Sequence, residues 1–202
     1  MLFRSNSGSS SLTLLDSTLT GNAATGRGGA IFSDRVLNVD RVTIDGNSAT
    51  DGAGVYLGNN GSSSATISNT TISGNSATGN GGGINSNKSL TITSSTISGN
   101  TANSKGGGLY ANGDQPIVTN VTIAYNSASA GAGGIHFESS ANAKLKNTIL
   151  AFNTGGNANG AQDSQGNNIE AVTNTAGLNQ PGDQNSVTAL QLGLGKIGRA
   201  HV

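Results

Sequence analysis

Cysteine and tryptophan are absent from this chain, only 3% of its 202 residues are aromatic, and only 10% are charged. The lack of cysteine excludes disulfides and zinc sites built on thiolates. Basic and acidic residues balance at ten each, so the chain lacks the basic footprint of a nucleic-acid-binding protein. No apolar run approaches the roughly 20 residues of a membrane-spanning helix. Glycine is abundant instead, with 32 residues.

The two ends of the chain read as translated sequencing adapter. Residues 196–202 are what AAG-ATC-GGA-AGA-GCA-CAC-GTC encodes, and residues 1–5 are what GTG-CTC-TTC-CGA-TCT encodes. Both strings resemble short-read adapters, so we exclude 1–5 and 196–202 from fold reasoning and expect a fragment of a longer protein. This removes three basic residues, Arg4, Lys196 and Arg199, and leaves seven basic residues against ten acidic ones.

One line of sequence recurs at intervals of 25 to 28 residues. The stretch "TTISGNSATGNGGGI" at 70–84 returns as "STISGNTANSKGGGL" at 95–109. Each copy has an asparagine as anchor, with apolar residues three and eight positions before it. The anchors are Asn22, Asn47, Asn75, Asn100, Asn126 and Asn153. Self-similarity at a fixed period is typical of solenoids.

Within a copy, apolar residues alternate with small polar ones, as in "SLTITSSTISGN" at 89–100. Alternation with a phase break predicts short strands separated by turns. The polar composition by itself would favour a disordered chain, but the aligned apolar columns favour a folded one. We therefore predict an all-β solenoid over residues 6–170, with about six coils of 25–28 residues. Each coil has three short strands, and an irregular exit segment follows at 171–195.

The "GN" pair and the glycine runs have structural interpretations in such a fold. Gly and Asn tolerate left-handed backbone angles, and stacked asparagine amides form hydrogen-bonded ladders. We therefore predict that the six anchors form an asparagine ladder at one corner of the solenoid. The glycine runs, such as "NGGGI" at 80–84, predict a second corner where neighbouring coils approach closely. A phosphate-binding loop is disfavoured, because no Lys-Ser/Thr pair completes it.

The copies "TISGNSATGNGGGI", "TISGNTANSKGGGL" and "TIAYNSASAGAGGI" resemble the repeats of bacterial right-handed parallel β-helix proteins. These include the polymorphic outer-membrane protein type and the pectate-lyase-like superfamily. The resemblance covers about residues 12–153 and implies an exported protein, either extracellular or at the bacterial cell surface or outer membrane. Tyr125 and Phe152 replace the glycine before the anchor asparagine, so we expect the last two turns to be less regular.

Enzymes of the pectate-lyase-like class need clustered carboxylates with basic residues nearby, either to bind Ca²⁺ or for general acid–base work. The only such patch that the coil register suggests is Asp16, Asp40, Arg41 and Asp45. We interpret it as a solvated ion-pair row, with a catalytic or Ca²⁺ site as the alternative. We expect no other cofactor. His136 follows the inward Ile135, and we predict that it points outward and is exposed.

Ladders of serine, threonine and asparagine on a mildly acidic rod suit weak, multivalent contact with glycans or a host or cell surface. Aromatic platforms for sugars are few: Tyr56, Tyr110, Tyr125 and Phe137. The sequence thus favours a monomeric, non-catalytic stalk or adhesin-like segment. The sequence does not distinguish an adhesin from a structural spacer. A polysaccharide lyase or glycoside hydrolase is the alternative.

Overall fold

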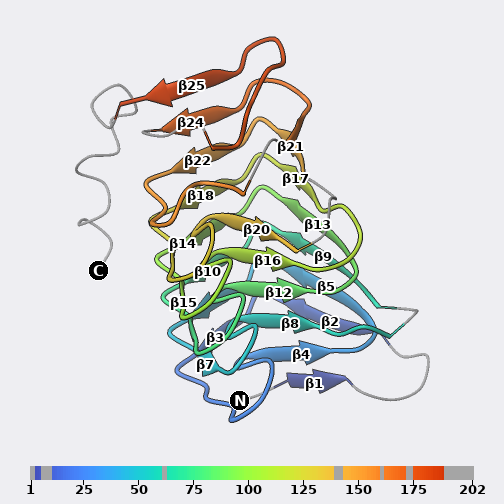
Figure 1. Cartoon of the computed structure of the whole chain (residues 1–202). Helices are drawn as coiled ribbons and strands as arrows, with labels where there is room; N and C mark the ends of the chain where they lie inside the picture. Colours follow the sequence, from blue (N-terminus) through green and yellow to red (C-terminus); the bar gives the residue numbers. More distant parts are fainter. Residues whose placement is uncertain are drawn as a thin grey trace.

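The computed structural model describes residues 3–5, 11–60, 63–138, 143–159, 162–171 and 175–188. The chain winds into a parallel β-solenoid, in which strands of successive coils stack one above another (Figure 1). Every strand pairing in it is parallel. Among these residues none forms a helix long and apolar enough to cross a membrane.

The strands form four sheets, which we number 1 to 4. Sheet 1 contains β1 (Phe3–Ser5), β4 (Ile31–Ser33), β8 (Val55–Leu57), β12 (Ile84–Ser86), β16 (Leu109–Ala111) and β20 (Ile135–Phe137). Sheet 2 contains β2 (Leu12–Leu15), β5 (Val36–Asp40), β9 (Ser64–Ser68), β13 (Ser89–Thr93), β17 (Ile117–Thr119), β21 (Lys144–Lys146) and β23 (Asp163–Ser164).

Sheet 3 contains β3 (Thr18–Thr20), β6 (Thr43–Asp45), β10 (Thr71–Ser73), β14 (Thr96–Ser98), β18 (Thr122–Ala124), β22 (Ile149–Ala151), β24 (Ile169–Ala171) and β25 (Gln184–Val187). Sheet 4 contains β7 (Ser48–Ala49), β11 (Ser76–Ala77), β15 (Thr101–Ala102) and β19 (Ser127–Ala128). The sequence predicted three sheets. The fourth arises because the two residues after each anchor asparagine also pair with the coils above and below.

The core is made of the apolar columns that the repeat predicts. Ile44, Ile72 and Ile97 pair in register on β6, β10 and β14 and are fully buried. The column eight positions before each anchor lies on sheet 2, and the column after the glycine run lies on sheet 1. The three columns belong to one continuous cluster along the whole solenoid.

Each regular coil uses left-handed backbone at three places, of which the third is the glycine run, where φ is positive at Gly28, Gly52, Gly81 and Gly106. The first corner joins sheet 2 to sheet 3 and places φ between +46° and +59° at one residue per coil. Those residues are Asp16, Arg41, Asn69, Ser94, Asn120, Asn147 and Asn167. The second corner lies just before the anchor asparagine. There φ is positive at Gly21, Gly46, Gly74 and Gly99, and also at Tyr125 and Phe152.

The coil after Phe152 is less regular, as expected, because sheet 4 ends at β19 and Thr154 makes only an isolated bridge with Ser127. The backbone of Tyr125 and Phe152 themselves is nevertheless regular. Their φ values of +58° and +56° match the +61° to +64° of the glycines at the same place. The backbone N–H of Tyr125 donates to the carbonyl of Ala151 at 3.1 Å, as the N–H of Gly99 donates to the carbonyl of Ala124 one coil earlier.

The glycine runs stand where coils approach each other closely, as predicted. A Cβ on Gly83 would lie 2.6 Å from the carbonyl oxygen of Gly108 and 3.2 Å from the Asn100 side chain. No side chain fits there, which explains why this position is glycine in several coils.

Near the two ends, β1 and β25 extend the sheets. β1 falls within the segment that we interpret as adapter and pairs with the edge of sheet 1 at β4, since an edge strand offers free backbone groups to any extended segment. β25 falls within 171–195 and pairs with β24 through an irregular register. Residues 196–202 lie outside the described residues.

Candidate functional site

The anchor asparagines form a buried, one-directional ladder. The Nδ2 of Asn75 donates to Oδ1 of Asn100 at 2.9 Å and to the carbonyl of Ile44 at 3.0 Å. The backbone N–H of Asn75 also donates to Oδ1 of Asn100. The same pattern links Asn22, Asn47, Asn75, Asn100, Asn126 and Asn153 in order. These amides are engaged with one another, so the predicted asparagine ladder is a structural element.

The ladder ends on a buried carboxylate that the sequence reasoning missed. Asn153 donates to Oδ1 of Asn157 at 2.9 Å, and Asn157 donates to Oε1 of Glu170 at 3.3 Å. Glu170 is fully buried and also accepts from the backbone N–H groups of Thr175 and Ala176. Glu170 stands in register with Leu150 in the inward column of sheet 3, but the two residues are 20 positions apart, so the interval of the repeat does not point to it.

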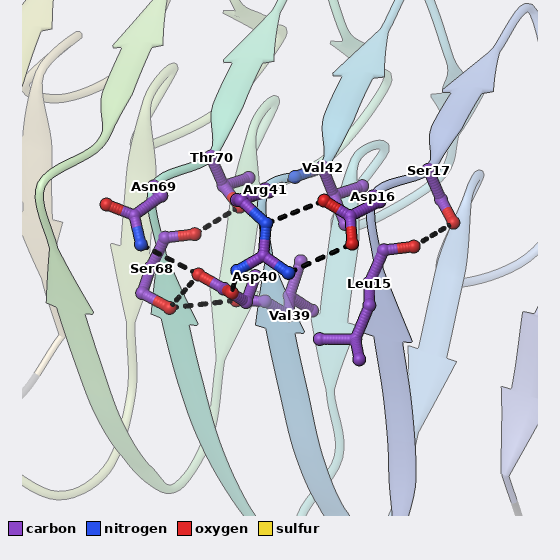
Figure 2. Close-up of polar contacts among 10 residues, drawn as sticks. All are labelled: Leu15, Asp16, Ser17, Val39, Asp40, Arg41, Val42, Ser68, Asn69 and Thr70. Carbon is purple, nitrogen blue, oxygen red and sulfur yellow. Dashed lines mark hydrogen bonds and ion pairs between the residues drawn. The ribbon is translucent and has the colours of Figure 1, made fainter.

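Three of the four predicted patch residues meet at the first corner, where β2 and β5 end (Figure 2). The Arg41 guanidinium donates to both carboxylate oxygens of Asp16, from Nε at 2.6 Å and from Nη2 at 2.9 Å. It also contacts the carboxylate of Asp40. The left-handed corner turns Asp16 and Arg41 outward on adjacent coils, and their side chains are about half exposed or more.

Asp40 links this cluster to the next coil. Its Oδ1 accepts from Ser68 Oγ and from Asn69 Nδ2, both at 2.8 Å (Figure 2). The hydrogen bonds from Asn69 and Ser68 hold the pKa of Asp40 below its usual value. The hydrogen bonds from Arg41 do the same for the pKa of Asp16, and Asp16 in turn raises the pKa of Arg41. All three groups therefore keep their charges at neutral pH.

Asp45, the fourth predicted patch residue, bonds elsewhere. It ends β6 on sheet 3, and its Oδ1 accepts from Ser73 Oγ on the next coil at 2.7 Å. The structure thus joins Asp16, Asp40 and Arg41 in one cluster, while Asp45 takes part in a separate contact between coils.

The cluster's chemistry suits an ion-pair row better than a calcium site. Ca²⁺ requires about six to eight oxygen ligands, whereas here a guanidinium lies between the two carboxylates. Within the described ranges, no group of three or more His, Cys, Asp or Glu side chains is arranged to hold a metal ion.

The outer face of sheet 1 carries a row of flat side chains. The central residues of β4, β8, β12, β16 and β20 align as Phe32, Tyr56, Asn85, Tyr110 and His136. Phe32 stacks on Tyr56 with ring centroids 5.4 Å apart, and Tyr110 stacks on His136 at 6.0 Å. The guanidinium of Arg27 lies 5.0 Å from the centroid of Tyr56. The sequence analysis considered Tyr56 and Tyr110 singly, although both follow the inward column of sheet 1 by one residue, and that shared register reveals the row.

The prediction that the side chain of His136 is exposed is wrong. The residue lies on the outer face, but its side chain is only 11% exposed. Its Nδ1 accepts from the backbone N–H of Ala132 at 3.4 Å, and its Nε2 lies 3.6 Å from the Glu138 carboxylate. Burial, and then the charge of Lys105, lower the pKa of His136. Burial, and then the charge of Glu138, raise the pKa of Tyr110 to about 12.

Of the four aromatic residues predicted as platforms for sugars, only Tyr125 is well exposed, at 43%. Phe137 belongs to the core, and Tyr56 and Tyr110 lie in the stacked row with 5% and 7% exposure. Tyr125 stacks on Phe152 of the next coil, with ring centroids 5.2 Å apart.

The comparisons with known proteins agree with this architecture. The family described as "right handed beta helix region" matches residues 5–187. No curated protein and no solved structure matches the chain.

Proposed function

Because the chain belongs to the right-handed β-helix family, we propose that it is a non-catalytic stalk or adhesin-like segment of an exported bacterial protein. The protein of which it forms part is secreted or sits at the cell surface or outer membrane. In this role the solenoid holds a binding surface at a fixed distance and makes weak contacts with glycans or other surfaces along its length.

The observation that carries the proposal is how the polar side chains are used. The ladder amides are saturated by one another, and Arg41 compensates the charges of Asp16 and Asp40. The outward residues of sheets 2 and 3 in the regular coils are mainly serine and threonine, as in β10, β13 and β14. Such side chains make single weak hydrogen bonds, and a rod that repeats them in every coil gains avidity by multivalency.

A glycan array tests whether the chain acts as an adhesin. The chain, labelled and multimerised on streptavidin, should be retained on a subset of glycans, and monomeric chain should be retained much less. If the multimeric chain binds no glycan, the adhesin function is ruled out and a structural spacer is the function that remains.

The alternative is a polysaccharide lyase or glycoside hydrolase, and the observation that favours it is the pairing of carboxylates with Arg41 at the first corner. This alternative predicts cleavage of a uronate polymer that is lost in Asp40→Ala, because Asp40 belongs to that pairing. If incubation of the chain with polygalacturonate and with bacterial uronate polymers releases no unsaturated or reducing ends, the proposal of a lyase or hydrolase is contradicted.

A further inference from the structure

The outer face of sheet 3 changes character along the solenoid. Its third strand residue is polar in the early coils, where Thr20, Asp45, Ser73 and Ser98 stand in register. It becomes alanine in β18, β22 and β24, as Ala124, Ala151 and Ala171. These three alanines are buried and form a cluster apart from the core, with Ile149 and Phe152 packed against them.

A shallow hollow lies beside this cluster, at the first corner of the same coils. Its volume is about 260 Å³. The rim carries three exposed amides, Asn120, Asn147 and Asn167, and the floor includes Ile149 and Ile169. Asn147 Nδ2 donates to Asn120 Oδ1 at 2.7 Å. The left-handed backbone at all three asparagines keeps the amides in one column.

The far side of the same strands ends in the stacked pair of Tyr125 and Phe152. Both hold left-handed angles, which are genuine outliers for a bulky residue, at a place where four other coils have glycine. The regular corner accounts for the angle, but large aromatic rings are not needed to make it. The Tyr125 ring is 43% exposed and stacked on Phe152, so it offers an aromatic platform on these coils.

We propose that the outer face of β18, β22 and β24 binds a neutral glycan chain that runs across the three strands. In Figure 1 these strands lie one above another on one side of the solenoid. The asparagine amides form hydrogen bonds with sugar hydroxyls, and Ile149 and Ile169 pack against the apolar faces of sugar rings. Tyr125 contacts the glycan at the opposite end of β18, at the second corner. This rests on the proposed adhesin function and gives it a location and a ligand class.

The ligand is neutral because the described residues of this face carry no charge to pair with an ionised sugar. The residues that line the hollow are asparagine, threonine, valine and isoleucine, and the alanines and aromatics complete the face. The cation next to it in sequence, Lys146, lies on the outer face of sheet 2, before the corner. Amides with both donors and acceptors match hydroxyl groups, which also have both.

The test uses the full chain and a double variant, Tyr125→Gly with Asn147→Gly. Glycine suits the left-handed angle at both positions, so the double variant keeps the fold while it loses the ring and the amide. Ser94→Gly is the matched control, because Ser94 is exposed and occupies the same left-handed corner outside the hollow. Calorimetric titration with neutral gluco-, manno- and N-acetylglucosamine oligomers, and with oligogalacturonate, measures the affinity. Thermal melting of each protein checks the fold.

We expect the double variant to bind a neutral oligomer about tenfold more weakly or worse, with the control close to the parent and each protein melting in one cooperative transition. Equal binding by parent and double variant overturns the proposed face and leaves the adhesin function standing. A preference for oligogalacturonate overturns the neutral ligand class. Parent chain that binds no glycan, in the array as well, overturns the adhesin function together with this site. If the parent self-associates and the double variant does not, the face binds a second copy of the chain, and the proposal of a glycan ligand is overturned.

Discussion

At the scale of single residues, Glu170 is the side chain on which the last coil depends. The ladder amides all direct their N–H groups toward it, and two backbone N–H groups of the following segment donate to it as well. Aligned hydrogen bonds polarise one another, so the row of amides stabilises a carboxylate at its end. Leu150 fills the equivalent place one coil earlier, which shows that an apolar side chain fits the space.

Glu170→Leu tests this dependence. The leucine leaves the backbone N–H groups of Thr175 and Ala176 without their acceptor, and each buried unsatisfied donor costs about 1–3 kcal/mol. We expect the free energy of unfolding, measured by urea denaturation, to fall by a few kcal/mol by the same reasoning. The exposed control Asp114→Asn should stay near the parent. A stability equal to or above that of the parent would show that packing outweighs the polar anchor.

His136 gives the chain a pH dependence with a defined sign. Burial lowers its pKa below 6.5, so between that folded value and 6.5 the unfolded chain binds more protons than the folded one. Stability from this group is therefore complete above about pH 6.5 and falls as the solution is acidified. The acceptor Nδ1 would also become a donor facing the N–H of Ala132.

The measurement is the free energy of unfolding of the parent and of His136→Asn at pH 7 and pH 5. Asparagine already occupies this row at Asn85, so it fits there without titrating. The neighbouring Glu138 stays ionised across this range, because its hydrogen bond with Lys105 lowers its pKa, and Tyr110 stays neutral. We expect the parent to lose more stability than His136→Asn. Equal losses in both proteins would contradict the role of His136.

At the scale of one coil, two kinds of glycine have different physical roles. Gly83 lies where a Cβ would meet the backbone of the next coil at 2.6 Å, whereas at Gly99 φ is +64° and the nearest atom is 3.9 Å away. The first position is limited by space and the second by backbone angle. Tyr125 and Phe152 show that the second limit can be overcome.

Alanine at each position separates the two roles. Gly99→Ala should cost about 1–2 kcal/mol, the strain of one left-handed residue. Gly83→Ala should cost more, because two coils must move apart and overpacking alone costs about 1–3 kcal/mol. Chemical denaturation of both variants measures the order, and a reversed order would show that coil contact does not limit the glycine run.

At the scale of the whole molecule, the regular part of the fold could be read from the sequence. The interval of the anchors predicted the inward columns of Ile44, Ile72 and Ile97 and the amide ladder, because stacking forces every coil to repeat the same burial. The register also placed Arg41 above Asp16. What repeats is set by neighbouring coils, so repetition in the sequence is enough to find it.

The features that do not repeat were harder to predict. The side chain of His136 is enclosed because Gly131 and Ala132 pass close to its ring and Glu138 lies beside it. Asp45 lies apart from the Arg41 cluster, where its side chain accepts a hydrogen bond from Ser73 of the next coil. Each of these depends on contacts particular to one coil, and the repeat carries no information about them.

The one-directional stacking of the coils has a mechanical consequence. A force that pulls the two ends apart along the axis would load the terminal coil first, since each coil is held mainly by its two neighbours. Peeling one coil of 25–28 residues releases roughly 80–100 Å of extended chain, at about 3.3–3.6 Å per residue. In an optical trap the rod should therefore lengthen in a series of nearly equal steps, so that it yields gradually under tension. A single rupture of the whole rod would show instead that the coils fail together.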